Sequence, residues 1–141
     1  MKVTDIIRAK GHPNVTATHR STMEVTTEDY VTLKGDCIIA VRADKSAFTL
    51  SEEVKEALRT EGSTVKAIIE VGGLREEVIG RGSRRLLLTS TTSLVFRRSY
   101  YVDPRTVMIG ADKAAVHLSR NIVKLLKDPL NTVTIILEVE V

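Results

Sequence analysis

The sequence predicts a mainly antiparallel β fold that carries two helices and is internally duplicated, with pseudo-twofold symmetry. Three observations predict it: a long segment that recurs at a constant shift, a strand–helix–strand pattern within each copy, and further segments in which apolar and polar residues alternate. We expect about eight strands in all. The chain is then one domain over residues 1–141, built from two repeats near 1–71 and 72–141.

The repeat is the clearest of the three observations. Residues 39–71 align with residues 107–139 without a gap, and 12 of the 33 aligned pairs are identical. The tripeptide Ala43-Asp44-Lys45 returns as Ala111-Asp112-Lys113, and Ser51 returns as Ser119. Because shared low complexity would not keep one register over this length, the repeat indicates a duplication.

Each copy predicts the same order of elements. Short β-branched runs at residues 37–41 and 106–109 predict buried strands, each followed by the Ala-Asp-Lys turn. Ser51 and Ser119 are then expected to cap two helices of about ten residues, the first ending near Gly62 and the second at Pro129. Alternation at residues 65–71 and 133–141 predicts a half-buried closing strand in each copy.

Segments outside the aligned copies are also typical of strands. Alternation over residues 15–26 predicts a strand whose threonines and Glu24 face solvent. Residues 85–89 and 94–98 predict a further pair, joined by a polar stretch. The glycine-rich sequences Gly72-Gly73 and Gly80-Arg81-Gly82 predict hairpin turns, since neither follows the pattern of a phosphate-binding loop.

The composition is that of a soluble globular domain, with 43% apolar residues, 28% charged residues and one cysteine. No run approaches the roughly 20 apolar residues of a membrane span, and charges interrupt the N-terminus too early for a signal peptide. The lone Cys37 favours a reducing, cytoplasmic compartment. His12, His19, His117 and Cys37 match no metal-ligand spacing, so we expect no metal and no cofactor.

Positive charge is concentrated in the second repeat. Residues 1–71 carry 10 basic and 11 acidic side chains, whereas residues 72–141 carry 11 and 7. Arginine matches phosphate with a planar fork, and Tyr100 and Tyr101 are nearby candidates for stacking on bases. This pattern favours non-catalytic binding of RNA or a phosphorylated ligand. The expected binding residues are Arg81, Arg84, Arg85, Arg97, Arg98, Tyr100 and Arg105.

Two alternatives stay open. An enzyme or small-ligand protein would place a pocket between the repeats, lined by His12, His19, Glu24, Asp36, Asp44, Lys45, Asp112 and Lys113. The difference in charge between the halves would instead serve self-association as a homo-oligomer. For the Ala-Asp-Lys turns the structural interpretation is favoured, because an Asp after a strand commonly accepts backbone N–H groups. We therefore assign no catalytic residue.

Short motifs spread over essentially the whole chain carry a resemblance. They are Gly11-His12-Pro13-Asn14, Thr18-His19, Thr22-Met23-Glu24, Gly35-Asp36-Cys37-Ile38, Ala43-Asp44-Lys45, Arg97-Arg98-Ser99, Arg105-Thr106 and Ala111-Asp112-Lys113-Ala114-Ala115. In combination they resemble an archaeal domain of unknown function, family 371. The resemblance implies an archaeal cytosolic protein with a β-sandwich-like fold, and it supplies no established activity, cofactor or catalytic residue. Because the motifs gather at His12, His19, Glu24 and Asp36, the resemblance is also compatible with a site there.

Overall fold

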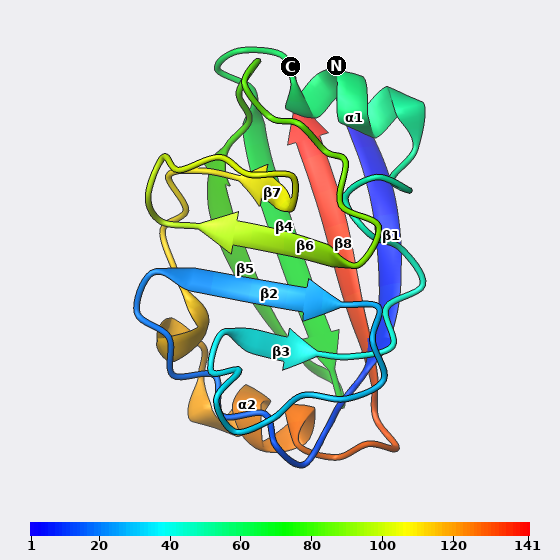
Figure 1. Cartoon of the computed structure of the whole chain (residues 1–141), viewed down its shortest axis with the longest axis vertical. Helices are drawn as coiled ribbons and strands as arrows, with labels where there is room; N and C mark the ends of the chain where they lie inside the picture. The colour runs from blue at the N-terminus through cyan, green and yellow to red at the C-terminus, as the bar shows by residue number, and fades with distance from the viewer.

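The computed structural model describes residues 1–141, which form two four-stranded sheets and two short helices (Figure 1). The first sheet has the order β1 (Lys2–Lys10), β8 (Thr132–Glu140), β4 (Thr64–Val71) and β5 (Leu74–Arg81), and all its neighbouring strands are antiparallel. The second has the order β3 (Ile38–Ala40), β2 (Thr22–Thr26), β6 (Ser93–Arg97) and β7 (Thr106–Met108). Here only β2 and β6 are antiparallel, because β2–β3 and β6–β7 are parallel pairs. The expected mainly antiparallel β fold with two helices is confirmed, and the second sheet is mixed.

The two sheets lie face to face, and the strands of the second cross those of the first (Figure 1). Helix α1 (Glu52–Leu58) lies at one end beside both chain termini, and α2 (Arg120–Leu126) lies at the other end, preceded by a 3₁₀ turn, η1 (Ala115–His117). Edge strands of the two sheets also meet. Lys10 and Val41 exchange two backbone hydrogen bonds where β1 ends, and Arg81 and Ile109 do the same where β5 ends. These bridges join the two sheets at both edges.

Each helix begins at the serine that the sequence predicts. The hydroxyl groups of Ser51 and Ser119 each accept a backbone N–H from the first turn, which satisfies a donor that has no partner inside the helix. Both helices are seven residues long, so the predicted length of about ten residues, with ends near Gly62 and at Pro129, was too long. The residues that follow them, Arg59 and Lys127, donate side-chain hydrogen bonds to carbonyl oxygens of neighbouring loops. Capping therefore fixes where both helices begin, and these two basic side chains tie the loops down where they end.

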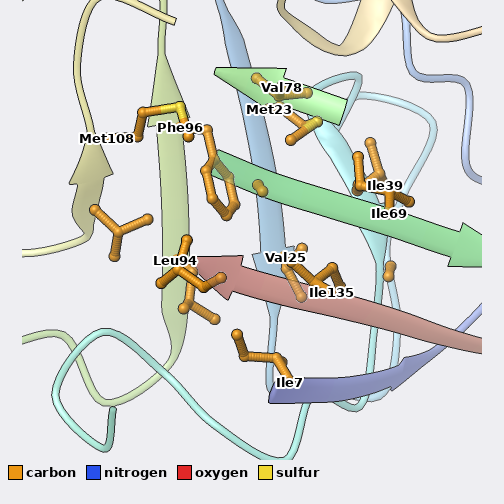
Figure 2. Packing of buried hydrophobic residues seen from close by; sticks show 14 of the residues in the cluster. Ile7, Met23, Val25, Ile39, Ile69, Val78, Leu94, Phe96, Met108 and Ile135 are labelled. Atoms are coloured by element: carbon orange, nitrogen blue, oxygen red, sulfur yellow. The ribbon is translucent and has the colours of Figure 1, made fainter. Parts of the chain in front are cut away.

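The core fills the space between the sheets (Figure 2). Ile7, Ile69 and Ile135 project from the first sheet towards Met23 and Phe96 from the second. The cluster contains 39 buried residues, and burial of this kind is the main force that stabilises a fold. The alternation predicted for residues 65–71 and 133–141 is confirmed, because the inward positions of β4 and β8 are buried.

Two strand predictions were wrong. Of residues 15–26 only β2 is a strand, and residues 85–89 form no strand. The reason is the same in both segments: Ala17 and Leu88 adopt left-handed backbone conformations, with φ of 50° and 52°, which a continuous strand does not tolerate. Both side chains are buried, so they mimic the inward positions of a strand. Glu24, expected to face solvent, is only 9% exposed.

Only one of the two glycine-rich sequences forms the predicted hairpin turn. Gly72 and Gly73 form the turn between β4 and β5, with φ of 55° and 81°, as predicted. The hairpin turn predicted at residues 80–82 is wrong, because Gly80 and Arg81 belong to β5. Gly82 follows and packs against the C-terminal end of α1, where a Cβ would collide with the carbonyl oxygen of Leu58.

Candidate functional site

Three of the predicted binding residues line one surface hollow of about 330 Å³. They are Arg81, Arg85 and Tyr100, and the rest of the lining is Glu61, Gly62, Gly82, Ser83 and Ile109. The hollow, called here the basic hollow, lies where β5, the loop after it, the turn after α1 and the loop after β6 meet. The other predicted binding residues, and those of the alternative pocket, line none of the cavities of this structure.

The fold explains how these distant segments meet. The bridge to Ile109 fixes the backbone of Arg81, and the ring of Tyr100 packs beside Gly110, which has a φ of 58°. On the other side, the backbone N–H of Ser83 donates to the carbonyl oxygen of Leu58 at the end of α1. The walls of the basic hollow are thus held by backbone contacts, which leaves the side chains available.

The side chains of the basic hollow are available for a ligand. Arg81 and Arg85 are exposed, and neither guanidinium group makes a hydrogen bond or an ion pair within the chain. Tyr100 is 67% exposed. Glu61 is the single acidic residue in the lining, and its Oε1 accepts the backbone N–H of Arg84 at 3.0 Å. Two cationic groups therefore face one carboxylate beside an aromatic ring.

Arg97 and Arg105 are engaged elsewhere, in a cluster around Asp103. The Asp103 carboxylate accepts from Arg97 Nη2 at 2.9 Å and from Arg105 Nη2 at 2.8 Å. Arg97 also donates to Thr106 and lies 5.0 Å from the ring centre of Tyr101. Arg97 is 9% exposed and the Arg105 side chain is 42% exposed, and both guanidinium groups are paired within the chain.

The cluster shifts the ionisation of its members. Burial acts to raise the pKa of Asp103, but the hydrogen bonds from Arg105 and Thr106 and the charge of Arg97 outweigh it, so this pKa is lowered. The hydrogen bond to Asp103 likewise raises the pKa of Arg105. The cluster is an ion-pair network that holds the loop between β6 and β7.

The remaining basic side chains divide into two groups. Arg84 and Arg98 are exposed without side-chain partners, but neither lines the basic hollow. The guanidinium group of Arg120 instead donates to five backbone carbonyl oxygens, including those of Ala17 and Leu118. Arg120 is therefore a structural residue that joins the start of α2 to the loop before β2.

Among the residues of the alternative pocket, His19 and Glu24 lie beside the segment of Asp36 and Cys37, whereas the two Asp-Lys turns lie apart. Asp44 accepts the backbone N–H of Arg8 on β1, and Asp112 accepts that of Ile79 on β5. Each lysine next in sequence pairs with an inward carboxylate on the same strand: Lys45 with Asp5 at 2.8 Å, and Lys113 with Glu76 at 3.2 Å. Because β1 and β5 are opposite edges of the first sheet, the two Asp-Lys turns do not face each other.

Asp5 and Glu76 also reach the starts of the helices. Their second oxygens accept the backbone N–H groups of Ser51 and Ser119. Burial acts to raise the pKa of Asp5, but the hydrogen bonds from Lys45 and the backbone outweigh it, so this pKa is lowered. The turns thus anchor the edge strands and the helices, which agrees with the structural interpretation of the Ala-Asp-Lys sequence.

The three histidines have one role in common. In His12, His19 and His117, Nδ1 accepts at least one backbone N–H within three residues along the chain. The imidazole rings therefore stabilise turns, in the way that Asp and Asn side chains often do. No group of three or more His, Cys, Asp or Glu side chains is arranged to hold a metal ion.

Glu24 and Cys37 meet Arg105 on the outward side of the second sheet. Glu24 Oε1 lies 3.5 Å from the Cys37 thiol, which donates to it, and 3.6 Å from Arg105 Nη1. Burial and the nearby charge of Glu24 raise the pKa of Cys37 to about 12. The thiol is therefore protonated at neutral pH and lacks the thiolate that nucleophilic cysteines need.

The sequence did not identify Glu61, Ser83 or Asp103 as members of these clusters. A signal for Glu61 was present, because the position that corresponds to it in the second copy is Pro129. Residues that differ between the copies are those that one half can use for binding. Asp103 lies between Arg97 and Arg105 in the sequence as well, and this proximity was the signal that could have identified the ion pairs.

The chain, a protein of two β-sheets, belongs to a family described as a domain of unknown function, DUF371, whose model matches residues 7–140. It is also 50% identical over 123 residues to an uncharacterized protein, MJ0206, of Methanocaldococcus jannaschii, which covers 87% of this chain and 90% of that protein. The expected resemblance is confirmed. No helix in the structure is long and apolar enough to cross a membrane.

Proposed function

We propose that this protein binds a phosphate-bearing ligand of the nucleotide class, free or within RNA, at the basic hollow. The observation that carries the proposal is the meeting of two unpaired guanidinium groups, Arg81 and Arg85, with the exposed ring of Tyr100 around one cavity. Guanidinium groups bind phosphate oxygens in pairs, and an aromatic ring offers a surface on which a base stacks.

The size of the cavity supports the same class of ligand. At about 330 Å³ the basic hollow lies at the lower end of the range of small-molecule sites, which suits one nucleotide unit rather than a duplex. Sequence-specific recognition of RNA generally uses unstacked bases of single strands in this way. Arg84 and Arg98 provide additional positive charge nearby along the chain for neighbouring phosphates.

The test is fluorescence polarisation of labelled single-stranded RNA and duplex DNA over a series of salt concentrations. The double variant Arg81→Ala/Arg85→Ala should lose at least about tenfold in RNA affinity and reduce the salt slope by roughly 0.7 per lost phosphate contact. Arg8→Ala is the matched control, because Arg8 is exposed on β1 at the opposite edge of the sheet and uses only its backbone in contacts.

Competition with inorganic phosphate and with nucleoside monophosphates separates the sources of the phosphate. Displacement of RNA by monophosphates at micromolar concentration indicates a nucleotide site, whereas resistance to them indicates a track along a strand. No binding of RNA, DNA or monophosphates at low salt contradicts the proposal. An equal loss of RNA affinity in Arg8→Ala would also contradict it, because the loss would then reflect the overall charge of the protein and not the basic hollow.

We also infer that the chain arose by duplication of a unit near residues 1–71. Two sets of contacts support the inference. Asp44 and Asp112 accept equivalent hydrogen bonds, from the backbone N–H of Arg8 and of Ile79. The bridge between Lys10 and Val41 is likewise equivalent to the bridge between Arg81 and Ile109. In addition, α2 begins 68 residues after α1, and β8 begins 68 residues after β4, which is the shift between the two aligned copies.

A further inference from the structure

We propose that Glu61 makes the basic hollow selective for guanine, so that the preferred ligand is a guanine nucleotide or a guanine within single-stranded RNA. The proposal rests on the proposed function and adds the identity of the base. It starts from an acidic residue in a site that is otherwise positively charged. A carboxylate there opposes phosphate binding, and its presence needs a reason in the chemistry of the ligand.

Glu61 is positioned by one hydrogen bond and by the backbone conformation that follows it. Its Oε1 accepts the backbone N–H of Arg84 at 3.0 Å, which ties the turn after α1 to the loop after β5. Gly62 follows with a φ of 78°, a conformation that glycine adopts without strain. Oε2 has no hydrogen-bond partner in the chain, and Oε1 keeps a second lone pair, so the carboxylate can accept two adjacent donors of a ligand.

An ionised carboxylate only accepts hydrogen bonds, and this property ranks the bases. The Watson–Crick edge of guanine presents two adjacent donors, N1–H and the N2 amino group. Adenine and cytosine each present one amino group beside a ring nitrogen that is itself an acceptor. Uracil presents a single N–H between two carbonyl oxygens, which a carboxylate repels. Guanine therefore fits Glu61 best and uracil worst.

The other lining residues complete the recognition. Tyr100 provides the stacking face for the base, and the guanidinium groups of Arg81 and Arg85 take the phosphate. Because purines have the larger π-face, stacking on Tyr100 favours guanine over the pyrimidines in addition to the contact with Glu61. Glu61 and Tyr100 act on the base, whereas Arg81 and Arg85 act on the phosphate, so base selectivity and phosphate binding are separable by mutation.

The experiment measures the affinities of the four nucleoside 5′-monophosphates for the wild-type chain by calorimetry. GMP should bind at least about fivefold more tightly than AMP and CMP, and more tightly still than UMP, as expected for a base contact of this kind. In Glu61→Gln, whose amide oxygen still accepts from Arg84, the preference for GMP over AMP should fall to within about twofold, whereas stacking on Tyr100 still favours both purines over the pyrimidines. Glu53→Gln on α1 removes the same charge outside the basic hollow and should keep the preference.

The outcomes separate this proposal from the proposed function. Equal binding of the four monophosphates overturns guanine selectivity and leaves phosphate binding at the basic hollow in place. A preference for GMP over AMP that survives in Glu61→Gln overturns the role of Glu61. Failure of every monophosphate and of RNA to bind overturns the proposed function, and the selectivity with it.

Discussion

At the scale of single residues, Asp103 is the most consequential carboxylate outside the basic hollow. It accepts hydrogen bonds from Arg97 and Arg105, and its side chain is 15% exposed beside an Arg97 side chain that is 11% exposed. Removing one partner of a buried ion pair leaves the other charge without compensation, which costs far more than loss of a surface pair. The loop between β6 and β7 therefore depends on one side chain.

Asp103→Asn should lower the free energy of unfolding by about 3 kcal/mol, measured by urea denaturation. Asp29→Asn is the control, because Asp29 meets Arg42 only at 4.0 Å with both side chains mostly exposed, and it should change stability little. The lowered pKa of Asp103 also predicts how stability depends on pH. The contribution of Asp103 to the free energy of unfolding is complete above the unfolded pKa of about 3.9 and is lost as pH falls through the folded-state pKa. Asp103→Asn should therefore flatten the loss of stability below about pH 4, and an unchanged acid profile would contradict this role.

At the scale of elements, the sequence predicted where both helices begin, placed their ends too late, and missed two strands, β1 and β5. Helix starts were visible because the serine caps are local signals. The strands were hidden because each has a carboxylate at an inward position, Asp5 in β1 and Glu76 in β5, where an apolar residue would reveal the alternation. In the fold, each of these carboxylates pairs with a lysine and accepts the backbone N–H of the serine that caps a helix. These partners come from other parts of the chain, so the pattern within the strand does not indicate them.

The junction between Gly11 and α2 gives a test at this scale. A Cβ on Gly11 would collide with the carbonyl oxygens of Leu126 and Asp128, which are backbone atoms at the end of the helix and cannot turn aside. Gly11→Ala should therefore destabilise the protein by more than about 3 kcal/mol, as expected for forced overpacking. Gly73→Ala, in open space with a φ of 81°, should cost only about 1 kcal/mol. Similar thermal midpoints for the two variants would show that the helix end moves freely.

At the scale of the whole molecule, the candidate site emerges from topology rather than from sequence neighbourhood. Arg81 and Arg85 could be selected from charge alone, and Tyr100 from its proximity to arginines. In sequence, Arg97 and Arg105 looked like the arginines that the fold leaves unpaired, yet both pair with Asp103, which lies between them along the chain. The turn after α1 and the loop after β5, by contrast, meet only in the folded chain, and a single sequence does not show that they lie together.

The topology also predicts how the molecule fails when it is divided. The strands of residues 1–71 pair across the midpoint of the chain: β1 with β8, β2 with β6, and β4 with both β5 and β8. Residues 1–71 expressed alone should therefore lack a folded monomer, since the only pairing retained within the fragment is the short β2–β3 pair. Circular dichroism and sedimentation should detect either a disordered chain or a dimer in which a second copy replaces the missing half, and mixing with residues 72–141 should restore the native spectrum. A fragment of residues 1–71 that is monomeric and unfolds cooperatively would contradict this view of the fold as one indivisible domain.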